Sequence, residues 1–245
     1  TFRDGVDLFS EAFYRMLTEG GVLPHTSQPA PYEFEERFER ARAEGTTLLV
    51  LPISSALSGT LQCARMVKEN GGYDNVYLYD SRCTTLMLEL LVREAAKRAE
   101  TLSIEELIAF VDDLRSRAHL LAGIDTLEYL AKGGRLNTAT AAIGSLLRVK
   151  PIITIGDGGT IDVIGKKMGS KTAVRELCGM VNLNKIDPEY GIRFLYSMRD
   201  ANVRELIVRM GLDPETVLEL QDIGPVIGSH TGPNTMGLFF YGTKR

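Results

Sequence analysis

Short apolar runs alternate with amphipathic stretches along the first half of the chain. The runs at residues 48–53 and 76–79 are bounded by polar or glycine positions, as buried strands are. The stretches between such runs carry apolar residues at helical spacing, and several of them end at glycine. Because strands and helices alternate in this way, the pattern predicts an α/β unit with parallel strands. The expected helices are at residues 6–17, 31–44, 61–68, 84–99 and 104–115.

The pattern changes after residue 118. Apolar runs at 152–155 and 160–164 flank the glycine-rich segment 156–159, and this arrangement is typical of a hairpin. A hairpin combined with helices favours an α+β arrangement over further parallel repeats. Other strands are expected at residues 120–124, 192–198, 216–220 and 237–241, and helices at 126–132, 138–147, 170–181 and 202–210.

This change divides the chain into two predicted domains. Residues 1–117 form an α/β domain with a parallel sheet in three layers, and residues 118–245 form an α+β domain with a mixed or antiparallel sheet. Ligands of parallel α/β sheets lie outside the carboxyl ends of the strands. The polar turns that follow the first two predicted strands, at residues 54–60 and 80–81, are therefore candidate binding sites.

The turn at residues 54–60 combines hydroxyl groups with a glycine just before a predicted helix. Unpaired N–H groups and the helix dipole favour an anion at such a place, and Gly59 allows close approach of the backbone. Ser55, Ser58 and Thr60 can each donate one O–H. Since no lysine or arginine lies in the turn, it fits one carboxylate better than a phosphate. A simpler interpretation is that Ser58 only caps the helix.

Composition narrows the range of partners. The 245 residues are 44% hydrophobic and 24% charged, which is typical of a globular chain with a sizeable core. The formal charge of −4, without any basic block, argues against nucleic acid as a partner. The three cysteines lack C-x-x-C spacing, which argues against disulfides and a metal site and for a reducing compartment. Neither an apolar run long enough to span a membrane nor a signal-peptide pattern is present in the sequence, so a cytoplasmic location is expected.

A series of motifs extends over nearly the whole chain. They are RDGVD at 3–7, TSQP at 26–29, ISSALSGT at 53–60, DS at 80–81, DTLEYLAKGGR at 125–135, KPII at 150–153 and HTGP at 230–233. In this order they resemble the DegV family of bacterial proteins. The resemblance implies that two domains bind one long-chain fatty acid and present its carboxyl group to a separate fatty acid kinase subunit. It implies no catalytic residue, no metal and no cofactor besides the bound fatty acid.

The resemblance also assigns roles to three side chains. It implies that Thr26 and Ser58 hydrogen-bond the fatty acid carboxylate and that His230 reaches the carboxyl group from the second domain. The backbone at Gly59 and the hydroxyl of Ser55 are added as further donors, because a buried carboxylate needs several. The residues alone leave other roles open: a cap or a turn for Thr26 and Ser58, and a structural role in a loop for His230.

Arg135 has two interpretations. It follows the glycines at 133–134, where it could cap a helix and interact with the helix dipole. In the family, its counterpart lies on the exposed face beside the acyl head, where a partner kinase could engage it. The other two histidines, His25 and His119, stand in no motif and are expected to be structural.

The chain departs from the family's pattern at several positions. Ala30 and Thr85 stand where serines are expected. Met87 and Glu89 stand where glycines are expected, so the acyl channel would be narrower if this helix lines it. The family also has a strand before residues 3–5, and we expect that strand to be absent from this chain. Candidate channel-lining residues are Leu57, Leu61, Met66, Leu86, Leu90, Leu91, Ile143 and Leu146.

Two other functions remain open. One is a serine-dependent acyl hydrolase or transferase, with Ser58 as nucleophile and His230 as base. The G-x-S-x-G pattern of hydrolases is absent, since Ala56 and Leu57 precede Ser58. The other is a sensor that binds a different small carboxylate.

Overall fold

The computed structural model describes residues 1–21, 23–136, 149–217 and 220–242. The chain folds as two compact units. Unit 1 comprises Thr1–Thr26, Ala118–Gly156 and Ile161–Arg245, and unit 2 comprises Ser27–Arg117 and Asp157–Thr160. The units differ from the linear division at residues 117/118 by the first 26 residues and by the short turn at 157–160. The domain boundary at residues 117/118 stays a prediction.

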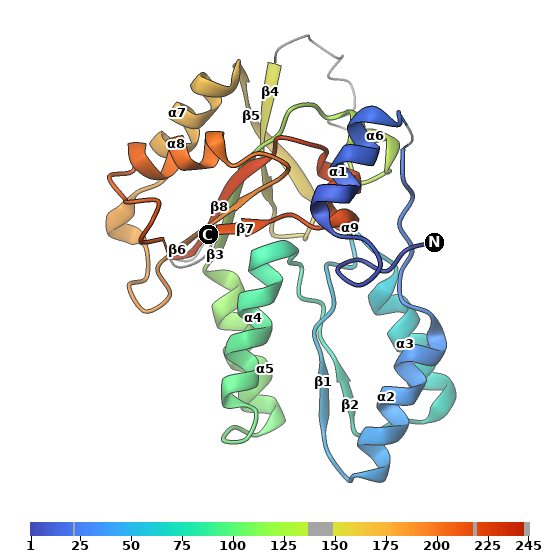
Figure 1. The fold of residues 1–245 in the computed structure, drawn as a ribbon. Coiled ribbons are helices and arrows are strands. Elements are labelled where there is room, and N and C mark those ends of the chain that lie inside the picture. The colour runs from blue at the N-terminus through green and yellow to red at the C-terminus, as the bar shows by residue number, and fades with distance from the viewer. Residues whose placement is uncertain (22, 137–148, 218–219, 243–245) are drawn as a thin grey trace. The chain divides into compact units, whose positions relative to one another are not determined.

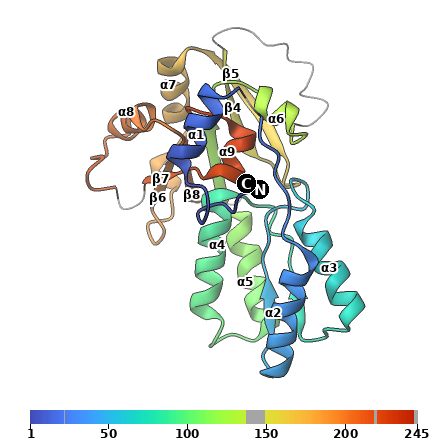
Figure 2. The same cartoon turned by 45° about the vertical axis from the view of Figure 1, so that its right-hand side comes forward.

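Unit 2 is a small parallel sheet between two pairs of helices (Figures 1 and 2). Its elements are α2 (Pro31–Ala43), β1 (Leu48–Val50), α3 (Thr60–Gly71), β2 (Val76–Leu78), α4 (Thr85–Arg98) and α5 (Ile104–Ser116). β1 pairs in parallel with β2, as the alternation of strands and helices predicted. The helices α2 and α3 pack together on one side of this sheet, and α4 and α5 pack together on the other.

One face of the first two turns of α4 is buried. Leu86, Met87, Leu90 and Leu91 are each at most 2% exposed, as expected of a helix inside a layered unit. Glu89 instead lies at the surface, where it forms an ion pair with Arg93 on the next turn. Of the two residues that replace family glycines, only Met87 therefore occupies the interior of the unit.

Unit 1 is built on a six-stranded sheet in the order β5-β4-β3-β8-β6-β7. β6 and β7 pair in parallel and the other neighbours are antiparallel, so the predicted mixed sheet is confirmed. The predicted hairpin is also present, as β4 and β5. The elements of this unit are α1 (Ser10–Glu19), β3 (Ala118–Gly123), α6 (Glu128–Lys132), β4 (Val149–Ile155), β5 (Ile161–Met168), α7 (Ser170–Met180), the 3₁₀ helix Leu183–Lys185, β6 (Ile192–Tyr196), α8 (Ala201–Arg209), β7 (Leu220–Asp222), α9 (Pro225–Thr231) and β8 (Met236–Tyr241).

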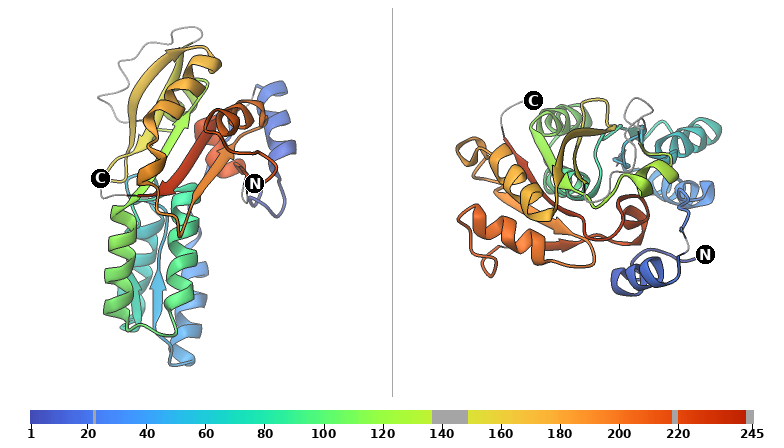
Figure 3. Two further views of the ribbon diagram at one scale, coloured as in Figure 1. Left: turned by 90° about the vertical axis from the view of Figure 1, so that its left-hand side faces the viewer. Right: turned by 90° about the horizontal axis from the view of Figure 1, so that it is seen from above.

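The helices α7 and α8 lie side by side against the sheet of unit 1 (Figure 3). Their core cluster includes Met236, Leu238 and Phe240 from β8. Side chains of a strand alternate between the two faces of a sheet, so Phe239 and Tyr241 point to the opposite face. All of β8 is buried, which means that both faces of this central strand are covered.

The loop predicted around His230 was wrong, because residues Pro225–Thr231 form the helix α9. Pro225 at the first helical turn favours a helix start, whereas Gly228 inside the segment suggested a loop. Tertiary packing explains the outcome, since Gly228 lies directly against aromatic side chains of α1. The predicted helix at 138–147 lies outside the described residues.

Within the described part of the chain, none of the helices combines the length and the apolar character needed to cross a bilayer.

Candidate functional site

The carboxyl ends of β1 and β2 are tied together by hydrogen bonds. The Ser81 hydroxyl donates to the Pro52 carbonyl at 2.5 Å, and the Ser54 N–H donates to the Cys83 carbonyl at 2.9 Å. Ser54, Ser81 and Cys83 are each completely buried. Because parallel strands end at the same edge of a sheet, the polar turns that follow them meet here.

Asp80 determines which way the Ser55 side chain points. Its carboxylate accepts hydrogen bonds from the Ser55 hydroxyl, from the Ser55 N–H at 3.1 Å and from the Arg82 N–H at 3.2 Å. Burial alone would raise the pKa of Asp80, but these donors outweigh it and lower that pKa. A hydroxyl has one proton, so Ser55 in this conformation has none left for a ligand. Its role as a ligand donor stays a prediction.

Ser58 lies half-buried just before α3. Its Oγ is 2.8 Å from the Thr60 Oγ1 and accepts the Thr60 N–H at 3.3 Å. This second bond supports part of the capping interpretation, although Gly59 occupies the N-cap position itself. When Thr60 is the donor of the hydroxyl pair, the proton of Ser58 remains available. Ser58 can therefore stabilise the start of α3 and still donate to an anion.

The motif at 26–29 meets the serine turn through Gln28, which the sequence analysis did not single out. The Gln28 Oε1 lies 2.2 Å from the position that a Cβ on Gly59 would occupy. The Cys63 thiol also donates to the Pro29 carbonyl at 3.8 Å. Gly59 thus gives room to the Gln28 amide. The only indication in the sequence that Gln28 lies near Gly59 was that both motifs appear in the same family pattern.

In unit 1, Thr26 and His230 are paired although 204 residues separate them. The Thr26 Oγ1 lies 2.9 Å from the His230 Nε2. Burial lowers the pKa of His230, and the charge of Arg135 lowers it further, so the imidazole is neutral at neutral pH. Its Nδ1 is buried and has no hydrogen-bond partner among the described residues. An unpaired buried nitrogen is uncommon, and it marks this ring as a candidate for ligand binding.

Glycines let three short helices of unit 1 pack closely around His230. A Cβ on Gly133 of the α6 C-terminus would lie 2.3 Å from the His230 Nδ1, and one on Gly232 would lie 2.3 Å from the ring of Tyr129. Gly228 meets the aromatic side chains of α1 in the same way. Because these glycines carry no side chain, the helices can pack this closely and hold the imidazole in its position.

Arg135 binds the end of α6. Its Nη1 donates to the Gly133 carbonyl at 2.5 Å, which supports the capping interpretation. Its charge also lies close enough to His230 to lower the pKa of that imidazole. Contact with a partner protein stays a prediction. His119 stacks on Phe240, with ring centroids 5.0 Å apart, in keeping with a structural role.

Thr85 was not among the predicted site residues. Its backbone has a φ of 49°, which is unusual for a β-branched residue, and its hydroxyl is buried without a partner among the described residues. Strained backbone of this kind gathers at functional sites. The strain depends on the surrounding tertiary structure, so no local pattern in the sequence could have revealed it.

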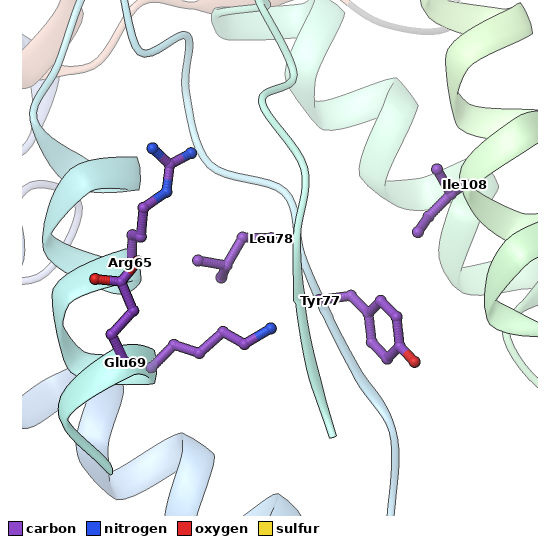
Figure 4. A pocket seen from close by; sticks show the side chains of 6 residues that line it. Arg65, Glu69, Tyr77, Leu78 and Ile108 are labelled. Carbon is purple, nitrogen blue, oxygen red and sulfur yellow. The ribbon is translucent and has the colours of Figure 1, made fainter. Parts of the chain in front are cut away.

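A pocket of about 320 Å³ lies at the open edge of β2 in unit 2 (Figure 4). Tyr77 and Leu78 point to opposite sides of the strand, and the Lys68 Nζ lies 5.8 Å from the centroid of the Tyr77 ring. Its lining is Arg65, Lys68, Glu69, Tyr77, Leu78 and Ile108. Three of these six side chains are charged, so this pocket differs from the apolar channel that a fatty acid tail requires.

The candidate channel residues have different surroundings. Met66 is 44% exposed on α3, so it lies at the surface rather than inside an enclosed channel. Ile143 and Leu146 lie outside the described residues. The remaining candidates are buried: Leu57, Leu61, Leu86, Leu90 and Leu91. Among the residues that the structure describes, no group of histidine, cysteine and carboxylate side chains is arranged to hold a metal ion.

Comparison with known proteins gives one family along the whole chain. The sequence profile of the family described as "Uncharacterised protein, DegV family" matches residues 1–243. A DegV domain-containing protein of Caldanaerobacter subterraneus subsp. tengcongensis is 34% identical over 244 residues, which cover 98% of this chain and 86% of that protein.

Two solved structures are similar to this fold. A DegV family protein from Thermus thermophilus, described for its fatty acid binding, is 30% identical with a TM-score of 0.85 over 99% of this chain and 87% of its own. A fatty acid binding DegV family protein from Streptococcus agalactiae is 26% identical with a TM-score of 0.86, over 98% of this chain and 86% of its own.

Replacing Gly133 with alanine tests the packing around the imidazole. The new methyl group would overlap the His230 Nδ1, so we expect Gly133→Ala to break the hydrogen bond between Thr26 and His230. The ¹⁵N resonances of the His230 ring should shift. Gly179→Ala is the control, because nothing lies within 4 Å of the added group in α7. Unchanged His230 resonances in Gly133→Ala would contradict this account.

The lowered pKa of His230 predicts a pH dependence of stability. The unfolded chain takes up this proton near the ordinary pKa of 6.5, whereas the folded protein takes it up only at lower pH. The free energy of unfolding should therefore fall as pH drops from about 6.5 towards the folded pKa. Thermal unfolding of the wild type should lose more stability over this range than that of His230→Gln, which cannot titrate. Parallel curves for the two proteins would show that His230 is not responsible.

Proposed function

We propose, from the premise that this chain belongs to the DegV family, that it binds one long-chain fatty acid and holds the carboxylate with Thr26, Ser58 and His230. The observation that carries the proposal is the pairing of Thr26 with a neutral, half-buried histidine whose buried Nδ1 lacks a partner among the described residues. The two similar structures described as fatty acid binding share at least 26% of their residues with this chain over nearly its whole length, and this supports the same ligand class.

The donors at the head of the ligand are uncharged. The Ser58 hydroxyl can give one hydrogen bond to a carboxylate. While Thr26 stays bonded to the neutral His230, that pair keeps one further proton, on the Thr26 Oγ1 or on the His230 Nδ1, depending on which of the two donates. Several hydrogen bonds are needed to offset the lost hydration of a carboxylate. Ser58 stands at the start of α3, where the helix dipole also favours a negative charge. Ser55 would join these donors only after release from Asp80.

Most of the affinity comes from the tail. Each buried methylene contributes ~0.8 kcal/mol, so about fourteen of them offer roughly 11 kcal/mol before the cost of association. The hydrogen bonds of the head contribute a few kcal/mol at most. The contacts of the head therefore set the orientation of the ligand, and the burial of its tail by apolar side chains sets the affinity. Met87 inside unit 2 is large enough to limit the length or shape of the tail if α4 lines the channel.

The hydroxyl that pairs with the histidine favours binding over hydrolysis. His230 meets Thr26, while the Ser58 hydroxyl meets Thr60. A serine hydrolase needs its base on the nucleophilic serine itself. The protein in this proposal is a carrier that keeps the tail hidden and leaves the carboxyl group for a partner enzyme.

We further propose that the partner is a fatty acid kinase subunit that phosphorylates the bound carboxylate. Arg135 is the candidate contact, because it is only half-buried and its charge lies close enough to affect His230. Under this proposal the acyl phosphate stays bound until it is transferred to phospholipid synthesis.

Mass spectrometry of an organic extract from the purified protein tests the first proposal. We expect a stoichiometric long-chain fatty acid, and palmitate titration of the stripped protein should show tight binding. Thr26→Val and Ser58→Ala should each weaken palmitate binding by about five- to a hundredfold, the loss of one charge-assisted hydrogen bond. Thr101→Val, which removes an exposed hydroxyl of unit 2, is the matched control.

Two outcomes would contradict fatty acid carriage. One is the absence of any lipid in the extract together with no palmitate binding. The other is turnover of p-nitrophenyl palmitate that Ser58→Ala abolishes, which would favour the acyl hydrolase instead.

Arg135 tests the kinase proposal separately. With a fatty acid kinase subunit and ATP, Arg135→Ala should reduce acyl phosphate formation while palmitate affinity stays within about threefold of the wild type, as expected of a charge at the rim of an interface. Arg135→Lys keeps the positive charge and should retain more of the activity. Equal acyl phosphate formation by all three proteins would exclude Arg135 from the partner contact.

A further inference from the structure

Ser54 is the centre of the hydrogen bonds that shape the serine turn. Its carbonyl accepts the N–H groups of Leu57 at 3.0 Å and Ser58 at 3.1 Å, and its hydroxyl oxygen accepts the Ala56 N–H at 3.2 Å. The same hydroxyl donates its one proton to the Gly159 carbonyl at 2.9 Å. Ser54 is completely buried, so water cannot replace these bonds.

The partner of Ser54 comes from a distant part of the chain. Gly159 belongs to the turn between β4 and β5, 105 residues later in the sequence. The strands β4 and β5 lie in the sheet of unit 1, yet the turn Asp157–Thr160 belongs to unit 2, as the serine turn does. A second hydrogen bond holds it there, since the Arg82 Nη1 donates to the Asp157 carbonyl at 3.4 Å.

Only glycine fits at residue 159. A Cβ there would lie 2.2 Å from the Ser54 Oγ and 3.0 Å from the Arg82 Cα. The first is the end of a short side chain fixed by its own hydrogen bonds and the second is backbone, so neither can move aside easily. The backbone of Gly159 also has a φ of 76°, which disfavours any other residue.

We propose that Ser54 and Gly159 are positioning residues for the carboxylate site. The Gly159 carbonyl fixes the rotamer of Ser54, and Ser54 in turn fixes the backbone that presents the Ser58 hydroxyl. The turn at 157–160 thus acts on ligand affinity through Ser54 and the serine turn. The part of this inference that concerns affinity rests on the proposed fatty acid binding.

Three glycine variants separate this role from ordinary destabilisation. Gly159→Ala should weaken palmitate binding by on the order of tenfold, at a temperature where every variant is folded, because it displaces the Ser54 hydroxyl. Gly72→Ala controls for backbone strain, since Gly72 of unit 2 also has a positive φ, of 61°, but nothing within 4 Å. Gly158→Ala controls for a change in the same turn, again with open space around it. Both controls should bind palmitate as the wild type does.

Ser54→Ala is the second route to the same prediction and inserts no new atom. It should weaken palmitate binding to a similar extent. In the Ser54→Ala background, Gly159→Ala should cause a smaller further loss, because the overlap with the hydroxyl is gone. Wild-type affinity in both single variants, or fully additive losses in the double variant, would overturn the proposal.

A measurement without ligand keeps the inference independent of the proposed function. The amide ¹H–¹⁵N signals of Ala56, Ser58 and Gly59 should shift in Gly159→Ala and stay in place in Gly72→Ala. If the wild type binds no palmitate while these signals shift, the proposed function fails and the positioning role of Gly159 stands. If the signals stay in place in Gly159→Ala, the positioning role fails.

Discussion

The hydrogen bonds between the ends of β1 and β2 are the constraint on which the rest of this site depends. Two strands of three residues each give little support to the turns that follow them. The Ser81 hydroxyl on Pro52 and the Ser54 N–H on Cys83 supply the missing rigidity. Neutral hydroxyls bind a carboxylate well only when they are held in place beforehand. Each hydrogen bond contributes little free energy, whereas the entropic cost of ordering the side chains is large by comparison.

The charge of Asp80 explains why Ser55 and Ser58 have different roles in the serine turn. Asp80 is ionised and lies beside the serine turn, where a second carboxylate would be repelled. The Ser55 hydroxyl and the N–H of Arg82 satisfy Asp80, so its charge is compensated by groups at the base of the turn. Ser58 lies three residues further on and does not bind Asp80. A carboxylate ligand therefore competes least with Asp80 when Ser58, rather than Ser55, is its donor.

The local pattern of apolar, polar and glycine residues was enough to predict most of the fold. The alternation of strands and helices predicted the parallel pairing of β1 with β2, and the glycine-rich segment predicted the hairpin of β4 and β5. These features depend on periodicity and turn chemistry, which neighbouring residues determine. The helix α9 was missed because its glycines are there for packing against α1 and α6, and a glycine needed for close contact looks the same in a sequence as a glycine in a loop. The candidate site was less predictable for the same reason. The hydroxyls at Thr26 and Ser58 stood in recognisable motifs, whereas nothing near Gly159 indicates that Ser54 binds its carbonyl, and nothing near Thr85 indicates strain. A sequence can thus suggest which groups perform the chemistry more readily than which groups hold them.

The motif at 26–29 adds a last step to this argument. Thr26 belongs to unit 1, where it meets His230, and Ser27 begins unit 2, where Gln28 lies against Gly59. The chain therefore passes from one unit to the other inside a single four-residue motif. Within it, one side chain is committed to the histidine and another to the serine turn. Two side chains whose partners lie in different units are therefore separated by a single residue of the backbone, Ser27.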